Sequence, residues 1–399
     1  MSNQKTNKLS TLNIAAMLSV FLFAGAGTYE NAAIQTMIEA WPDVSTATIR
    51  LVVSLPTLFS LPFMLIIGVL AGKKLSYKFC ALAGTAMIAA GGVIPFFVTS
   101  SWTLVLVCRC VLGIGAGFLG MRNPLIVKSV SGAEQAKYIG WATTLYSLGG
   151  FIAGPVVGVL CTYGWNYSFL FNGLAFLPLI LQVLFLKEPP KEEESVEKAA
   201  EAAAPKEKVS VDWRIIYYVI IMAVSTMILY PMLSGLATFM GDKGIGNSVL
   251  AGTALSAYSI AGVIANMFLG TVTKVCRKYT IAAMCALIAI GQAVLLFVPS
   301  VATVFIGVVL AGAGFGIMMS ILQVYNGKVA HPAIMGTCST VIIAMIQLGV
   351  FLHGYFITAC DAIFHSSTDV ESAYLGCVII SVVLTILSAV LKVWPDDEA

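Results

Sequence analysis

The sequence predicts an all-α integral membrane protein whose twelve transmembrane helices form two six-helix repeats around a central cavity. Apolar residues make up 59% of the chain and charged residues 10%, and the mean hydropathy is +0.94. Soluble domains are about 45–50% apolar and about 25% charged. Twelve apolar runs each approach or exceed the roughly 20 residues that a membrane-spanning helix needs. Short patterns in the first six runs recur in the last six, which indicates a duplicated architecture.

The twelve runs divide into two sets of six. The predicted N-terminal six-helix bundle covers residues 11–187, with spans at 11–37, 46–72, 78–98, 102–128, 135–161 and 166–187. The predicted C-terminal bundle covers residues 213–394, with spans at 213–240, 247–273, 279–298, 301–329, 333–361 and 370–393. Residues 188–212 between them are rich in Glu and Lys and too polar to build a core. This segment is therefore expected to be a charged cytoplasmic linker.

The basic residues predict the orientation in the membrane. With the N-terminus inside, most lysines and arginines fall in cytoplasmic segments, and only Arg50 and Lys243 fall in outer loops. This is the bias that the positive-inside rule describes. The first apolar run is too long for a cleavable signal, and no small-residue cleavage site follows it. We therefore expect a multi-pass protein of the plasma (inner) membrane with both termini in the cytoplasm.

Two patterns occur once in each half. GVLAGKKLSYK at 68–78 resembles GTVTKVCRKYT at 270–280, and LGIGAGFLG at 112–120 resembles AGAGFGIMM at 311–319. Repeats related by a pseudo-two-fold axis along the membrane normal place a solute site between them near mid-membrane. The sequence thus predicts a path for a solute through the protein.

Three motifs in the first half carry a family resemblance. The loop after the second span matches a basic signature at Gly68, Leu70, Ala71, Lys73 and Lys78, and departs from it at Gly72 and Leu75. The fourth span has an arginine followed by glycines, at Arg109, Gly113, Gly115 and Gly117. The fifth span reads GFIAGPVVG, with Gly150, Gly154, Pro155 and Gly158. With these motifs the chain resembles the major facilitator superfamily of secondary transporters over nearly its whole length.

The resemblance implies alternating access between two halves, without a cofactor and usually as a monomer. In the family, the fifth-span motif is associated with export of a solute in exchange for protons. The resemblance also implies gating roles for Gly68, Lys73 and the fifth-span motif. The glycines of that motif recur every four residues and form one flat ridge, while Pro155 removes a backbone hydrogen bond. Such a helix packs tightly in one conformation and rocks in another; ordinary small-residue packing is the alternative.

Glu30 is the only acidic residue deep in an apolar run. At the rise of an α-helix, Glu30 lies about 13 Å from the outer end of the first span, and Arg109 lies about 10 Å from the outer end of the fourth. We expect the two to pair, with Glu30 taking and releasing a proton; a permanent ion pair that only holds two helices together is the alternative. His353 is a second proton-coupling candidate, because imidazole titrates near neutral pH. A neutral, hydrogen-bonded imidazole is the alternative there.

Helical spacing separates the polar residues of the fourth span. Asn123 follows Arg109 by fourteen positions and returns close to the same face, so both are expected in the cavity, whereas Arg122 points about 140° away. Arg122 lies near the cytoplasm, which favours a gate or an interfacial role unless the solute is an anion. The other solute-contact candidates are neutral polar residues: Asn31, Tyr230, Asn266, Gln323, Asn326 and Gln347. For these, a hydrogen bond between helices is the alternative.

These features predict a secondary transporter that exports a small organic solute in exchange for protons. The alternative is an uptake permease or exchanger for a small organic anion, with Arg109 and Arg122 as carboxylate anchors. An enzyme or an ATP-driven pump is disfavoured, because no HExxH motif, nucleophile–base pair or Walker loop occurs. Three histidines and nine scattered cysteines show no metal-ligand spacing, so no metal is expected. The expected partners are the solute, protons and the lipid bilayer, and not nucleic acid. A sensor that binds without flux is a third possibility.

Overall fold

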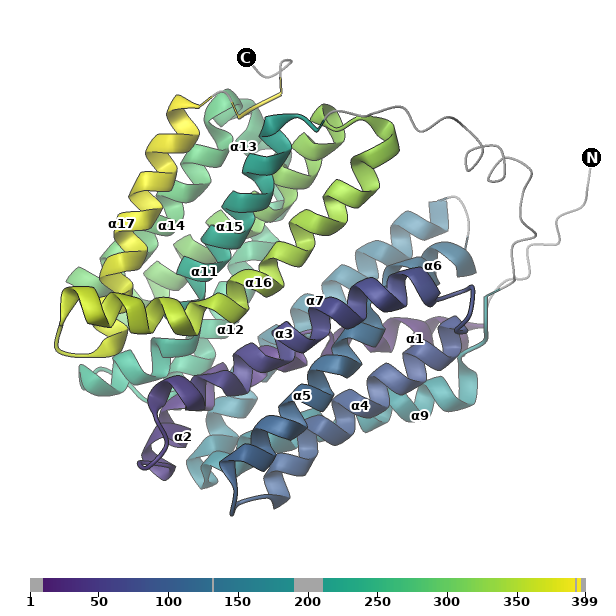
Figure 1. Ribbon diagram of the computed structural model, residues 1–399, viewed down its shortest axis with the longest axis horizontal. Coiled ribbons are helices and arrows are strands. Elements are labelled where there is room, and N and C mark those ends of the chain that lie inside the picture. Colours follow the sequence, from purple (N-terminus) through teal and green to yellow (C-terminus); the bar gives the residue numbers. More distant parts are fainter. Residues whose placement is uncertain (1–9, 131–132, 190–210, 392, 396–399) are drawn as a thin grey trace, which may run out of the picture.

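The computed structural model describes residues 10–130, 133–189, 211–391 and 393–395, and these residues form helices packed in two halves (Figure 1). The N-terminal half contains α1 (Thr11–Ser19), η1 (Val20–Phe23), η2 (Ala26–Ala33), α2 (Ile34–Ala40), α3 (Thr46–Leu70), α4 (Tyr77–Phe97), α5 (Trp102–Phe118), η3 (Leu119–Met121), α6 (Arg122–Ser129), α7 (Ala133–Leu160), η4 (Cys161–Tyr163), η5 (Trp165–Phe169), α8 (Leu170–Gly173) and α9 (Phe176–Phe185). The C-terminal half contains α11 (Trp213–Asp242), α12 (Ser248–Met267), α13 (Leu269–Cys276), η6 (Arg277–Tyr279), α14 (Thr280–Phe297), α15 (Val301–Val329), α16 (Pro332–Phe364) and α17 (Asp369–Val390).

The predicted all-α membrane fold is confirmed. In the described parts of the chain, 11 helices are long and apolar enough to cross a membrane, and the bent pair Thr11–Phe23 and Ala26–Ala40 supplies the twelfth span. The eighth span is shorter than predicted, because α12 ends at Met267 and the chain turns at Phe268 into α13. None of the residues of α13 is buried. Residues 190–210 of the predicted linker lie outside the described residues.

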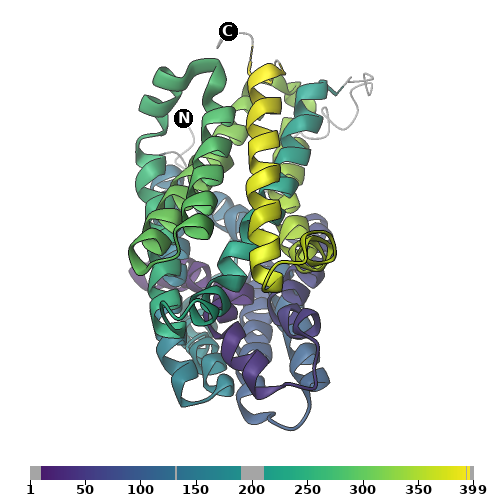
Figure 2. The same ribbon diagram turned by 90° about the vertical axis from the view of Figure 1, so that its left-hand side faces the viewer.

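Each half has its own apolar core. One cluster of buried side chains runs from Ala16 to Leu186, and a second runs from Tyr218 to Val393. Figure 2 shows the halves as two layers, with the C-terminal half (green and yellow) above the N-terminal half (purple and blue). Because the cores are separate, either half has the packing it needs to move as one body against the other.

The halves touch on one side and diverge on the other. We call the side where α9 ends and α11 begins the linker side, and the opposite side the far side. Contacts between the halves run mainly along α7 with α12 and along α3 with α16. The contacts reach the far-side ends of these helices, where Gly158 meets Ser248. Toward the linker side the two halves spread apart (Figure 1).

Short polar groups fix where the helices begin. The N-cap side chain accepts a hydrogen bond from the backbone of the first turn in several helices, through Ser45, Ser76, Ser101, Asn247, Ser300 and Thr368. At α4 a second acceptor adds to this: the Glu188 carboxylate accepts from the backbone N–H groups of Tyr77 and Lys78 at 2.7 Å each. A carboxylate is favourable at the positive end of a helix. Glu188 therefore ties the chain just after α9 to the start of α4.

The loop before α4 explains one departure from the family signature. Gly72 has φ +79°, a left-handed conformation that side chains with a Cβ rarely adopt. Its N–H donates to the Leu75 carbonyl at 2.7 Å, and the Tyr77 ring fills the position that a Cβ would take. An acidic residue at this position would be strained. The expected gating residues of this loop lie at its surface: Lys73 is exposed, and no atom lies within 4 Å of a Cβ placed on Gly68.

Candidate functional site

The first span is broken where Glu30 lies. The sequence predicts one continuous helix over 11–37, but the chain bends by 43° between Thr11–Phe23 and Ala26–Ala40. Ala26–Ala33 forms the 3-10 helix η2, which places Glu30 and Asn31 inside the N-terminal half. The break follows Gly25, and Gly27 lets η2 approach α3, because a Cβ there would lie 3.0 Å from Pro56. A periodicity argument assumes a regular helix and does not detect such a break.

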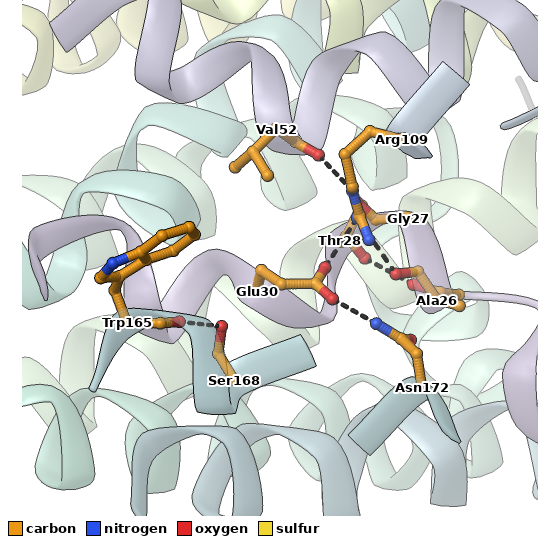
Figure 3. A network of polar contacts seen from close by, with 10 residues as sticks. Ala26, Gly27, Thr28, Glu30, Val52, Arg109, Trp165, Ser168 and Asn172 are labelled. Carbon is orange, nitrogen blue, oxygen red and sulfur yellow. Dashed lines mark hydrogen bonds and ion pairs between the residues drawn. The ribbon is translucent and has the colours of Figure 1, made fainter. Parts of the chain in front are cut away.

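Glu30 and Arg109 form an ion pair that is sealed inside the N-terminal half. Arg109 Nη2 lies 2.7 Å from Glu30 Oε2, and both side chains have no solvent exposure. Asn172 of α8 donates its Nδ2 hydrogen to the other carboxylate oxygen, Oε1 (Figure 3). Four elements of this half, η2, α3, α5 and α8, therefore meet around one carboxylate and one guanidinium.

Arg109 also binds backbone carbonyls that the helices leave free. Its Nε donates to the Val52 carbonyl at 2.8 Å, and its Nη2 donates to the Gly27 carbonyl at 2.8 Å. Pro56 has no N–H, so the Val52 carbonyl four residues before it lacks its helical donor. Pro56 is thus the sequence signal that indicates a carbonyl in need of a partner. Asn172 carries no comparable signal, because its approach to Glu30 depends on how α8 packs.

The structure separates Arg109 from Asn123, which the sequence places on one face. Arg109 has no exposure, whereas Asn123 is exposed. The prediction that they share an environment is wrong, because the fourth span changes to a 3-10 turn at Leu119–Met121 and the two residues belong to different helical segments. Arg122, which opens α6, is half-buried, with its guanidinium carbon 5.6 Å from the centre of the Phe21 ring.

The polar candidates of the C-terminal half lie in different settings. Asn326 is fully buried and donates to the Met335 carbonyl at 3.1 Å and to Ser339 Oγ at 2.8 Å, so it ties α15 to α16. Gln323 donates to the Ser339 carbonyl at 3.4 Å in the same contact. Gln347 instead crosses to the other half, where its Nε2 donates to Ser60 Oγ at 2.7 Å.

His353 is buried in the C-terminal half, and the partly buried Tyr230 of α11 lies beside it. Their rings are 5.5 Å apart. His353 is fully buried and donates from Nδ1 to the Val350 carbonyl, while its Nε2 has no hydrogen-bond partner among the described residues. The Asn31 and Asn266 side-chain oxygens are also buried without a partner in the described chain. Each of these atoms has an unused acceptor position.

The fifth-span motif forms the contact between the halves on the far side. A Cβ on Gly154 would overlap the Gly252 carbonyl of α12, and a Cβ on Gly158 would lie 2.6 Å from the Ser248 carbonyl. The packing is looser at Gly150, where an added Cβ would lie 3.5 Å from Ser259 Oγ. The backbone N of Pro155 also lies at this contact, 3.3 Å from a Cβ placed on Gly252. We name this contact of α7 with α12 the glycine seam.

The far side is also closed by an ion pair that the sequence does not predict. Arg50, expected in an outer loop, lies in α3, is 1% exposed and places its Nη2 3.3 Å from Asp369 Oδ2 of α17. Its Nε and Nη1 have no hydrogen-bond partner in the described chain. A cavity of about 260 Å³ borders this ion pair and is lined by residues of both halves: Thr46, Ala47, Arg50, Gly354, Ile357, Thr358, Asp361 and Asp369.

Replacing Asp369 by asparagine tests this ion pair. We expect Asp369→Asn to loosen the far side, because Arg50 would lose the one carboxylate that lies within 4 Å of it among the described residues, and losing a hydrogen bond between charged groups amounts to about tenfold or more in an equilibrium. Deuterium uptake of peptides covering Thr46 to Ser54 should rise accordingly. Glu371→Gln is the matched control, because Glu371 pairs with Lys243 of its own half at 3.1 Å. Equal uptake in the two variants would show that Asp369 does not hold the halves together.

The described residues contain no group of three or more His, Cys, Asp or Glu side chains that could hold a metal ion. The polar groups instead hold helices in place or lie between the two halves.

Comparisons of the sequence with family models and of the fold with solved structures both point to transporters of one kind of fold. A family model described as Major Facilitator Superfamily matches residues 10–354. The fold is similar to that of the nucleoside transporter NupG, with a TM-score of 0.73, 15% identity, and 95% of this chain and 98% of that chain covered. It is similar to a bacterial homologue of the human lysosomal transporter Spinster in its inward-facing, unoccupied conformation, with a TM-score of 0.67, 15% identity, and 96% and 97% covered. It is also similar to a POT family transporter in complex with 5-aminolevulinic acid, with a TM-score of 0.72, 11% identity, and 96% of each chain covered. No curated protein matches the sequence.

Proposed function

Because this chain belongs to the Major Facilitator Superfamily of transporters, we propose that it exports a small organic solute in exchange for protons by alternating access. The observation that carries the proposal is the one-sided contact between the halves. They meet at the glycine seam and at the pair of Arg50 with Asp369, and they diverge toward the linker side (Figure 1). Such an arrangement is one of the two end states that a rocking transporter visits.

The orientation follows from the basic residues. Lysines of the described loops cluster on the linker side, as Lys73, Lys74 and Lys78 do before and at the start of α4. The positive-inside rule makes this side cytoplasmic. We therefore propose that this state is open to the cytoplasm and that the protein lies in a plasma membrane with both termini inside. We propose that the protein works as a monomer, since each half supplies its own core.

We assign the proton to Glu30, which is the only fully buried carboxylate among the described residues. In this state its two oxygens are occupied by Arg109 and Asn172. The guanidinium favours the charged carboxylate, so coupling requires that the opposite state of the cycle loosens this pair and makes proton uptake favourable. His353 is the second candidate, because its Nε2 has a free acceptor position.

A flux assay in proteoliposomes tests the proposal. An imposed proton gradient and a trapped pH dye report proton movement while candidate solutes are added. We expect solute-dependent proton flux in the wild type and its loss in Glu30→Gln, whereas exchange of labelled solute against unlabelled solute persists. Glutamine keeps the shape of Glu30 but loses its charge and its titration, and its one amide oxygen can accept from Arg109 or from Asn172 but its NH2 group cannot. Proton flux that survives in Glu30→Gln and disappears in His353→Gln would move the proton to His353.

A second candidate function is favoured by one observation. Arg122 has no carboxylate within 4 Å among the described residues, unlike Arg50 and Arg109. This favours an uptake permease or exchanger for an organic anion. In the same assay, transport of carboxylates without any proton movement would support this second function and contradict proton-coupled export.

A further inference from the structure

One tyrosine joins the two sides of the break in the first span. Tyr29 of η2 donates its hydroxyl hydrogen to the carbonyl of Leu22 in η1 at 2.5 Å. Its ring folds back over the break, where Gly25 leaves room for it: a Cβ on Gly25 would lie 3.1 Å from Tyr29 Cε1. Tyr29 is only 6% exposed. The hydrogen bond is therefore shielded from water and fixes how the two parts of the span meet.

The helix of the glycine seam contacts this hydrogen bond with its backbone. A Cβ on Gly149 of α7 would overlap the Leu22 carbonyl and would lie 2.7 Å from the Tyr29 hydroxyl. Gly154 follows Gly149 by five positions, which corresponds to about 140° around a helix. Consequently α7 presents Gly149 to the broken first span and Gly154 to α12 of the other half, and it approaches both at backbone distance.

On its other side, the Tyr29 ring lies close to a donor of Glu30. The centres of the Tyr29 ring and the Phe171 ring of α8 are 5.5 Å apart, in an edge contact. Phe171 precedes Asn172, whose amide donates to the Glu30 carboxylate. Tyr29 is thus next to Glu30 in the chain and next to one of its donors in space.

The two donors of the Glu30 carboxylate are fixed to other helices (Figure 3). A Cβ on Gly92 of α4 would lie 2.5 Å from Asn172 Cβ, so α8 is packed tightly against α4. Arg109 also binds η2, but its Nε is held by the Val52 carbonyl of α3 at 2.8 Å. The carboxylate belongs to η2, which contacts α7 and also α11 and α12 of the C-terminal half. A movement of η2 with α7 would therefore change the distance from the carboxylate to donors that are fixed to α3 and α4.

We propose that Tyr29 and Gly149 are positioning residues for proton coupling: they fix the broken first span to α7, so that a movement of α7 at the glycine seam changes how firmly the two donors hold Glu30. The inference rests on the proposed assignment of the proton to Glu30, and it names the contact through which the opposite state of the cycle loosens the ion pair. When the seam opens, the broken span follows α7, because the two are in backbone contact. Coupling between two sites is reciprocal, so a change at Tyr29 also changes the equilibrium at the seam.

Hydrogen–deuterium exchange of the purified full-length protein tests this linkage without a solute. Tyr29→Phe removes only the hydroxyl and its hydrogen bond, which is present in the state in which the far side is closed. We expect exchange to become about two- to tenfold faster in residues 22–33 and also in residues 248–256 at the seam, the range expected for one hydrogen bond. Gly149→Ala adds a methyl group that overlaps the Leu22 carbonyl and should change the same two regions. It decides the question alone if Tyr29→Phe does not fold.

Two variants are matched controls. Tyr218→Phe removes the same kind of hydrogen bond, from a buried tyrosine hydroxyl to the Val393 carbonyl at 2.6 Å, inside the C-terminal half. Gly140→Ala adds the same methyl group to α7 where no heavy atom lies within 4 Å of it. In both controls, residues 22–33 and 248–256 should exchange as in the wild type.

The outcomes separate this inference from the proposed function. If exchange becomes faster in residues 22–33 but not in residues 248–256, Tyr29 only stabilises the broken span and the inference is wrong. The inference is also wrong if neither region changes, or if Tyr218→Phe changes the seam equally. Loss of proton flux in Glu30→Gln would then leave the proposed function standing. Conversely, linked exchange in a protein whose proton flux survives Glu30→Gln would support the linkage and contradict the assignment of the proton to Glu30.

Discussion

Replacing Gly154 by leucine is expected to stop transport while leaving the protein folded. A Cβ at this position overlaps the Gly252 carbonyl across the glycine seam, and backbone atoms of two helices cannot yield as a flexible side chain does. Overpacking by even a few methylenes costs about 1–3 kcal/mol in a well-packed interior. The cost falls only on the state in which the far side is closed, so the equilibrium shifts toward the opposite state. We expect exchange of labelled solute to slow by about tenfold or more.

The seam provides its own control on the same helix. Gly140→Leu adds the same atoms to α7 where no heavy atom lies within 4 Å of the new Cβ. It should transport at close to the wild-type rate, and its far-side peptides should exchange deuterium as the wild type does. In Gly154→Leu, peptides covering Ser248 to Ser256 should take up deuterium faster. Equal transport rates in the two variants would show that the fifth-span glycines only pack and do not gate, which is the alternative reading of the motif.

Hydropathy was sufficient to predict the fold but not the irregular parts of the helices. In a bilayer every span must be long enough to cross the hydrocarbon core and must satisfy its backbone hydrogen bonds internally, which favours helices. A count of apolar runs therefore predicts twelve helical spans. The breaks after Gly25 and at Leu119–Met121 leave the chain apolar and are therefore invisible to a count of apolar residues. The turn at Leu119–Met121 lies between Arg109, which is buried, and Asn123, which is exposed, so counting residues as in a regular helix did not predict their different burial.

A contact between residues far apart in the sequence could be predicted only where the two residues carry opposite charges and lie at a similar predicted depth in the membrane. Glu30 is the one buried acid among the described residues, Arg109 is a buried base at a similar predicted depth, and the structure joins them at 2.7 Å. Arg50 is different, because its burial depends on α16 and α17 of the other half. From the sequence alone, a residue near the end of a span is expected to be exposed. Its burial can be predicted only when it is known how the two halves pack together.

Replacing Arg109 by leucine has the second large expected effect, and this effect is on stability. Leucine leaves Glu30 buried without a counter-charge and removes the donors of the Val52 and Gly27 carbonyls. Breaking a buried ion pair by removing one partner costs about 3–5 kcal/mol, and unfilled buried acceptors add to this. We expect Arg109→Leu to lower the thermal unfolding temperature in detergent strongly, or to prevent recovery of folded protein. Arg109→Lys keeps the charge but only part of the hydrogen bonding, and should lie between this variant and the wild type.

The double variant Glu30→Leu/Arg109→Leu decides how this pair acts. Removing both charges leaves no buried ion, and replacing a buried pair by apolar residues is often neutral or stabilising by about 1–4 kcal/mol. We therefore expect the double variant to be more stable than Arg109→Leu alone and to lack proton flux. The ion pair would then contribute little net stability. The free-energy cost of burying its two charges would be explained by a role in proton coupling. If the double variant is as unstable as Arg109→Leu, the lost carbonyl bonds dominate, and Arg109 serves chiefly to support the broken first span.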